Sequence, residues 1–153
     1  MLMQVQETEW FSNEYLDHQK TRYKDVVCAT SAAPTFFSDY SFNGLNYVDG
    51  GVTTNNPSFS ILTHARLQQG RDMRKTILVS VGTGIAAQEN FDTQQGNQLL
   101  YWASNFSSVS MNNQMREADQ LCREELGDNY YRFDPILYQN IAMDATSKPD
   151  IEM

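Results

Sequence analysis

The sequence predicts an α/β fold with a mainly parallel central sheet that is covered by helices. Residues 76–81, Thr-Ile-Leu-Val-Ser-Val, form a nearly continuous apolar run, which is typical of a parallel strand buried on both faces. Apolar residues recur every three or four positions in residues 57–69 and 110–126, which indicates a helix on each side of that strand along the chain. Another strand is expected at residues 130–133, so strands and helices alternate as in layered α/β domains.

The first third of the chain is expected to hold an irregular segment, one strand and a hairpin. Residues 4–24 are polar, with scattered aromatic side chains and weak periodicity, and are interpreted as an irregular or short-helical entry segment. Residues 25–30, Asp-Val-Val-Cys-Ala-Thr, form a short apolar run and are interpreted as a buried strand. Residues 42–48 are expected to form the next strand or a hairpin, which turns at the Asn43-Gly44 pair favoured in tight hairpins.

The two predicted helices have recognisable ends. Asn56 is expected to cap the first helix and Gly70 to end it. Gly127 ends the second helix, which presents one face made of Met111, Met115, Ala118 and Cys122. A loop followed by a helix is expected in residues 85–108, and the start of a further helix in residues 142–153.

Composition narrows the class of protein. The 153 residues suit one domain, in which residues 1–24, 25–84 and 85–153 are expected to form successive parts. The net charge of −8 argues against a nucleic-acid partner and against binding of anionic lipid by charge alone. The sequence shows no signal-peptide pattern and no apolar run of about 20 residues, which favours a cytoplasmic location. Cys28 and Cys122 are expected to be buried free thiols, and no cofactor or metal is expected because no His/Cys cluster has ligand spacing.

One carboxylate stands in a position typical of a reacting group. The apolar run of residues 45–48 delivers Asp49 directly into Gly50 and Gly51, and a helix start follows. A carboxylate at the end of a strand, beside a tight turn and a helix start, lies where α/β enzymes hold reacting groups. The other interpretation is an Asx turn that closes a loop.

The residues that usually act with such a carboxylate, a nucleophilic serine and a histidine, are less clearly indicated by the sequence. The sequence contains no G-x-S-x-G nucleophile elbow. Ser31 fits a helix cap better than a nucleophile, and Ser80 lies inside a predicted strand. His18 and His64, the two histidines, have no spacing that would join them to a catalytic triad.

A glycine pair after the predicted strand 76–81 superficially matches a dinucleotide fingerprint. Residues 82–87, Gly-Thr-Gly-Ile-Ala-Ala, fit G-x-G-x-x-A. An apolar helix and a second strand should then follow, but residues 88–95 are polar. A tight loop at the strand exit is therefore the better interpretation.

Three motifs together resemble the patatin-like phospholipases. They are Ala-Thr-Ser-Ala-Ala-Pro-Thr-Phe-Phe at 29–37, Val-Asp-Gly-Gly at 48–51 followed by Asn-Asn-Pro at 55–57, and Val-Ser-Val-Gly-Thr-Gly at 79–84. They occur in the order and at the kind of spacing found in that family, and Ala-Met-Asp-Ala at 142–145 is similar to its late helix. The resemblance covers roughly residues 25–150.

The resemblance implies a lipid acyl hydrolase that works with a Ser-Asp dyad. Asp49 of the Asp-Gly-Gly motif, with Gly50 and Gly51 as its turn, would be the base that activates a serine. The implied partners are a lipid or acyl-ester substrate and a transient membrane or micelle surface. Ser31 is a structural neighbour of the site in this resemblance and is not the nucleophile.

The family's G-x-S-x-G serine and its glycine-rich oxyanion loop precede these motifs, and neither occurs in the sequence given. The chain is therefore expected to be the C-terminal part of the domain and to be inactive alone. A non-catalytic binding or scaffold remnant and a nucleotide-binding domain remain as alternatives. A strand at residues 76–81 without upstream neighbours would keep an open edge and bare apolar faces, so self-association or association with the missing N-terminal half is expected.

Overall fold

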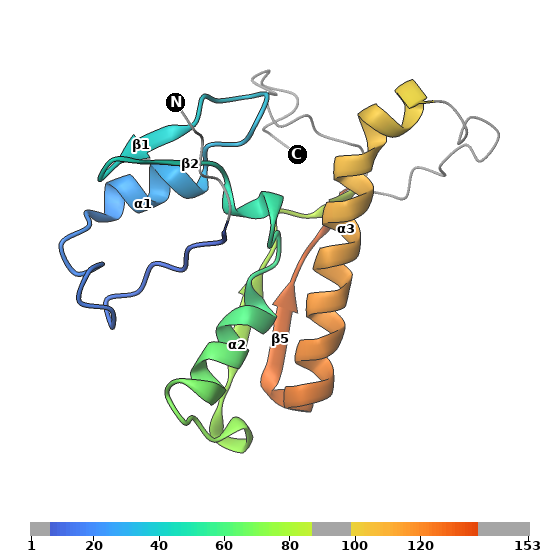
Figure 1. Ribbon diagram of the computed structural model, residues 1–153. Coiled ribbons are helices and arrows are strands. Elements are labelled where there is room, and N and C mark those ends of the chain that lie inside the picture. Colours follow the sequence, from blue (N-terminus) through green and yellow to red (C-terminus); the bar gives the residue numbers. More distant parts are fainter. Residues whose placement is uncertain (1–6, 87–98, 138–153) are drawn as a thin grey trace. The chain divides into compact units, whose positions relative to one another are not determined.

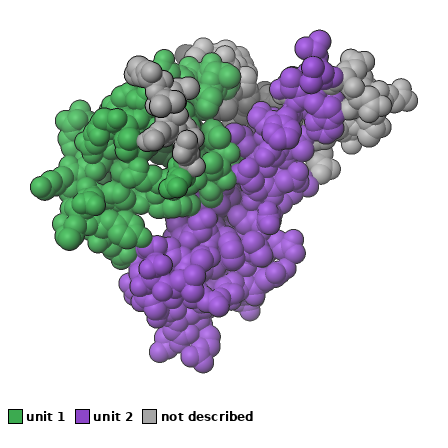
Figure 2. Space-filling view, in the orientation of Figure 1, with its two compact units in different colours: residues 1–55 green, residues 56–153 purple. Residues whose placement is uncertain are grey.

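A computed structural model describes residues 7–86 and 99–137 (Figure 1). The chain divides into two compact units, residues 1–55 and residues 56–153, and each is described by itself (Figure 2). The helix start predicted at residues 142–153 lies outside the described residues. In the part of the chain that the structure describes, no helix combines the length and the apolar character needed to cross a membrane.

The first unit contains helix α1 (Tyr23–Thr30), strands β1 (Tyr40–Phe42) and β2 (Leu45–Tyr47), and the 3₁₀ turn η1 (Gly50–Val52). The antiparallel hairpin predicted around Asn43-Gly44 is confirmed, with Phe42 paired to Leu45. Asn43 and Gly44 have φ angles of 52° and 78°, which a tight hairpin turn of the mirror-image type requires. Residues 7–22 form turns and irregular chain, as predicted.

The strand predicted at residues 25–30 is wrong, because this segment lies in α1. An apolar run of six residues is too short for its periodicity to separate a strand from a helix. The buried pair is Asp25 and Ala29, which are four positions apart and therefore lie on one side of a helix. Cys28 is exposed on α1, so the prediction that it is buried is also wrong.

Polar and aromatic contacts hold α1 and the hairpin together. The buried Asp25 accepts hydrogen bonds from Arg22 Nε at 2.7 Å and from the Tyr40 hydroxyl at 2.9 Å. The bond from Arg22 lowers the pKa of Asp25, so the carboxyl group is charged at neutral pH. On the hairpin, the rings of Phe42 and Tyr47 stack with centroids 4.5 Å apart, and Phe11 packs against both.

The described residues of the second unit form four strands and two helices. Strand β3 (Leu78–Val81) pairs in parallel with β5 (Tyr130–Phe133), and β4 (Ile85–Ala86) pairs in parallel with β6 (Ile136–Leu137). The helices are α2 (Ser58–Leu67) and α3 (Leu99–Leu126), and two 3₁₀ turns, Met73–Lys75 and Gly127–Asn129, precede β3 and β5. The parallel strands predicted at residues 76–81 and 130–133 are thus confirmed. β4 and β6 were missed because each has only two residues.

Three helix ends lie at or close to their predicted positions. Asn56 Oδ1 accepts the Ser58 N–H at 3.1 Å, as expected of a capping side chain, but α2 begins at Ser58 and its N-cap position is occupied by Pro57, one residue later than predicted. Gly70 and Gly127 have φ angles of 63° and 54°, the left-handed conformation typical of a helix end. Helix α3 begins at Leu99 and is therefore longer than the predicted helix at residues 110–126.

The core of the second unit lies between the β3–β5 pair and the two helices. It is formed by the buried side chains of Leu62, Cys122, Leu126 and Tyr130, with Phe59, Met73 and Leu78 packed against them. Figure 1 shows α2, α3 and β5 side by side in this unit. On the opposite side of β3, Val79 and Val81 are 58% and 76% exposed. Helices therefore cover one face of this strand pair, whereas the sequence predicted a strand covered on both faces.

Candidate functional site

Asp49 lies two residues after the end of β2 and is the N-cap residue of the turn η1. Its Oδ1 atom accepts the Gly51 N–H at 2.6 Å, and its own N–H donates to the Ala32 carbonyl at 3.0 Å. The first bond closes an Asx turn, which was the structural interpretation of this segment. It also fixes the direction of the carboxylate, so the structural and the catalytic interpretations of Asp49 are compatible.

Glycine at positions 50 and 51 avoids close contacts with the residues around Asp49. A Cβ atom at position 51 would lie 2.9 Å from Asp49 Oδ1 and 3.1 Å from Asn55 Oδ1. A Cβ atom at position 50 would lie 3.1 Å from Thr30 Oγ1. Asp49 is half-buried in this turn. The carboxylate is thus held by the main chain and has access to solvent, an arrangement suited to a group that exchanges a proton with a substrate or a nucleophile.

The segment after α1 lies against this turn. Ala32 and Ala33 are only 4% and 8% exposed, and Ala32 carries the carbonyl that binds the Asp49 N–H. Small side chains at these positions allow the two backbone segments to approach each other. Ser31 is exposed and occupies the C-terminal cap position of α1, the end of a helix and not its start as expected.

His18 has a structural environment in the first unit. Its ring lies 3.2 Å from Glu9 Oε1, and its centroid is 4.7 Å from the Phe11 ring. Its Nδ1 atom also accepts the Ser12 N–H at 3.3 Å. His64 lies in the last turn of α2 in the second unit. The contacts of His18 with Glu9, Phe11 and Ser12 are those of a structural residue.

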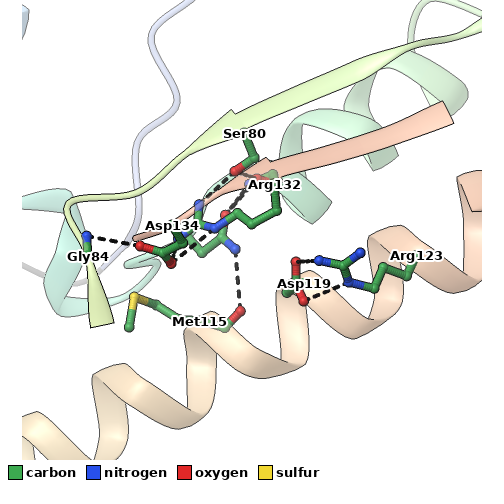
Figure 3. A network of polar contacts seen from close by, with 9 residues as sticks. Ser80, Gly84, Met115, Asp119, Arg123, Arg132 and Asp134 are labelled. Carbon is green, nitrogen blue, oxygen red and sulfur yellow. Dashed lines mark hydrogen bonds and ion pairs between the residues drawn. The ribbon is translucent and has the colours of Figure 1, made fainter. Parts of the chain in front are cut away.

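A buried polar network in the second unit was not predicted (Figure 3). Arg132 and Asp134 form an ion pair of 2.6 Å, with side chains 10% and 9% exposed. Arg132 Nη1 donates to Ser80 Oγ at 2.7 Å, and Ser80 Oγ lies 2.7 Å from the hydroxyl of Ser58. The Ser58 hydroxyl is in turn 2.6 Å from Asn56 Oδ1. Ser80 therefore serves a structural network, in keeping with its place inside a strand.

The same network explains the glycines after β3. The Gly84 N–H donates to Asp134 Oδ1 at 2.9 Å, and Gly84 has a φ angle of 108°. A Cβ atom at position 82 would collide with the carboxylate of Asp134 and come within 2.5 Å of Arg132 Nη2. Residues 85–86 form β4, not the helix that a dinucleotide site needs. The interpretation of residues 82–84 as a strand-exit loop is therefore supported.

One feature of the sequence could have indicated this network. Arg132 and Asp134 are two positions apart at the end of a predicted strand, so their side chains point to the same face. Sequence alone does not show which residues of β3 they meet, because that depends on the register of two strands about 50 positions apart.

Comparisons with known proteins agree on one family. A family model described as patatin-like phospholipase matches residues 3–60, the stretch that contains Asp49. Calcium-independent phospholipase A2-gamma of Homo sapiens is 24% identical over 145 residues, which cover 92% of this chain and 18% of that protein. The protein of the same name from Mus musculus is 28% identical over 137 residues, which cover 88% of this chain and 17% of that protein.

A plant protein extends the comparison. Patatin-like protein 1 of Arabidopsis thaliana is 33% identical over 88 residues, which cover 44% of this chain and 21% of that protein. The chain thus spans about a fifth of the length of the curated relatives it matches. The motifs, the mixed α/β structure with its small parallel sheets, the family model and these relatives all support a relationship to the patatin-like phospholipase family.

Proposed function

We propose that this chain contributes the aspartate of a Ser-Asp dyad to a patatin-like lipid acyl hydrolase, with Asp49 as the base. One observation carries the proposal: Asp49 follows β2 with its carboxylate fixed by the Gly51 N–H, within the stretch that matches the family model. The relatives that align along most of the chain are named phospholipases, which supports an acyl lipid as the substrate.

The geometry of Asp49 suits the role of a base. The carboxylate accepts the hydroxyl proton of a serine while that oxygen attacks the ester carbonyl, and it gives this proton to the alcohol that leaves as an acyl-enzyme forms. Water then attacks the acyl group, and the carboxylate takes a proton from this water and returns it to the serine oxygen as the carboxylic acid leaves. The Gly51 N–H bond keeps the carboxylate in one orientation through both steps. None of these steps needs a metal ion, which agrees with the name "calcium-independent" of the mammalian relatives.

The serine partner of Asp49 is proposed to lie outside these 153 residues. No G-x-S-x-G motif occurs among them, and Ser31 and Ser80 have the structural roles described above. Removal of a serine nucleophile costs on the order of 10⁶ in kcat. The 153 residues by themselves are therefore expected to show almost no hydrolysis, and activity should require a longer polypeptide that contains them.

The test is the Asp49→Asn variant of the longest polypeptide that contains this chain. Asn keeps the size of the side chain and its acceptor oxygen but cannot take a proton. We expect kcat for a water-soluble short-chain ester to fall by roughly 10⁴, as for the loss of a catalytic aspartate in other serine hydrolases. Asp39→Asn is the matched control, because Asp39 is an exposed carboxylate in the same unit. Equal activity of the Asp49→Asn variant and this control would refute the assigned role.

A further inference from the structure

We propose that the outer face of α1, together with the basic residues at its start, is the surface through which this protein contacts a lipid–water interface. The proposal rests on the proposed function for the choice of lipid as the partner. It adds which residues of the chain meet the lipid and how they do so. All of them belong to the first unit.

Helix α1 has two opposite faces of different character. Its inner face carries Asp25 and Ala29, which are 5% and 4% exposed. Its outer face carries Tyr23 and Val27, which are 86% and 60% exposed and lie one turn apart. The packing of the unit thus uses one side of the helix and leaves an aromatic and a branched apolar side chain projecting together on the other.

Basic residues gather beside this apolar pair. Lys20, Arg22 and Lys24 supply three of the eleven Lys and Arg residues of the chain within five positions, although the whole chain carries a net charge of −8. Lys20 and Arg22 also line a hollow of about 430 Å³ beside the first turn of α1. The carboxylate in that hollow, Asp25, is already bound by Arg22 and Tyr40.

This combination fits a lipid interface. Tyrosine is enriched at the boundary between acyl chains and water, because its ring is apolar and its hydroxyl stays hydrated. Lysine side chains can lay their methylene groups on apolar surface while the ammonium reaches a phosphate. A basic cluster near the surface strengthens attraction to anionic lipid even when distant charges are screened. Tyr23 and Val27 are proposed to enter the interface, with Lys20 and Lys24 at the level of the lipid phosphates.

The test measures vesicle binding of the polypeptide used for the Asp49 experiment. Co-sedimentation is compared between vesicles of phosphatidylcholine alone and vesicles that also contain phosphatidylserine. We expect Tyr23→Ser/Val27→Ser to weaken binding to both by about tenfold, since two apolar groups no longer enter the lipid. Lys20→Gln/Lys24→Gln should weaken binding chiefly to the vesicles with phosphatidylserine, again by roughly tenfold.

The matched control removes two exposed apolar side chains from another helix. Ile61 and Leu67 of α2 are 49% and 68% exposed, and Ile61→Ser/Leu67→Ser should leave vesicle binding unchanged. Equal loss in this control, or no vesicle binding by the unsubstituted protein, would overturn the proposal. Unchanged vesicle binding by Tyr23→Ser/Val27→Ser would also overturn it.

Hydrolysis of a water-soluble ester separates this proposal from the proposed function. The α1 variants should keep that activity, because the soluble substrate needs no interface. The Asp49→Asn variant should bind vesicles normally while it fails to hydrolyse the ester. If Asp49→Asn stays active but the α1 variants lose vesicle binding, the surface proposal stands and the dyad assignment fails.

Discussion

The two cysteines illustrate how strongly one residue type depends on its surroundings. Cys28 is exposed on α1, whereas Cys122 is fully buried in the core of the second unit. Burial, with a smaller effect of Asp119, raises the pKa of the Cys122 thiol to about 11. Because the thiolate is the reactive form, both the low accessibility and the raised pKa suppress reaction at Cys122.

We therefore predict that one thiol reacts under native conditions and two react after denaturation. Iodoacetamide at pH 8 should label Cys28 within minutes and leave Cys122 unlabelled, as measured by mass spectrometry of tryptic peptides. The Cys28→Ser variant should show no native labelling and serves as the control. Native labelling of Cys122 at the rate of Cys28 would contradict the packing of α3 against the strand pair.

At the scale of elements, the β3–β5 pair is held together by contacts of the Arg132–Asp134 ion pair as well as by the hydrogen bonds between the two strands. The parallel register places Ser80 opposite Arg132, so the guanidinium reaches the hydroxyl of the neighbouring strand. Asp134 then binds the Gly84 N–H and closes the loop after β3. A buried ion pair is stabilising only when its remaining hydrogen-bonding groups are satisfied. Ser80 accepts a hydrogen bond from Arg132, and the Gly84 N–H donates one to Asp134.

Gly82→Ala should disrupt this arrangement. The new methyl group would collide with Asp134 and with Arg132, whose side chains are buried and ion-paired and have little room to move. We expect the free energy of unfolding to fall by about 1–3 kcal/mol, as for overpacking of a buried site. Urea unfolding followed by circular dichroism measures this, with Thr83→Ala, an exposed position in the same loop, as the control. Equal urea midpoints for Gly82→Ala and Thr83→Ala would show that the loop accommodates the added methyl group without loss of stability.

Features that depend on contacts between residues close together in the chain could be predicted from the sequence, whereas features that depend on distant contacts were harder to predict. The hairpin at Asn43-Gly44 and the start of α2 near Asn56 are set by contacts within a few residues, and both were predicted, the helix start to within one residue. Asp49 was singled out because an apolar run leads directly into two glycines there; the Asx turn with Gly51 is present, and the role of Asp49 as a base stays a prediction. Helix α1 was missed because its apolar run is short and its buried side includes the charged residue Asp25, which is bound by Arg22 and also by Tyr40, 15 positions away.

For the whole molecule, the bare face of the β3–β5 pair is the feature with the largest consequence. Helices cover one face, and the other carries side chains that are between 49% and 76% exposed: Ile77, Val79, Val81, Tyr131 and Phe133. A contiguous apolar surface of this kind is uncommon on a monomeric protein and marks a contact site. The short strands also leave backbone groups at their edges that another chain could pair with.

We predict that the 153-residue chain associates with itself through this face, and that a longer polypeptide covers the face with other segments. Sedimentation velocity should show an average mass above that of the 17.5 kDa chain that rises with concentration. Val81→Lys/Phe133→Lys should shift the distribution toward the monomer, because two charges would be desolvated in the contact. Ile61→Lys/Leu67→Lys, at positions 49% and 68% exposed on helix α2, which covers the opposite face of the strand pair, is the control and should leave the distribution unchanged. A monomer at every concentration, for both the unsubstituted chain and its variants, would show that the face is covered within the chain itself.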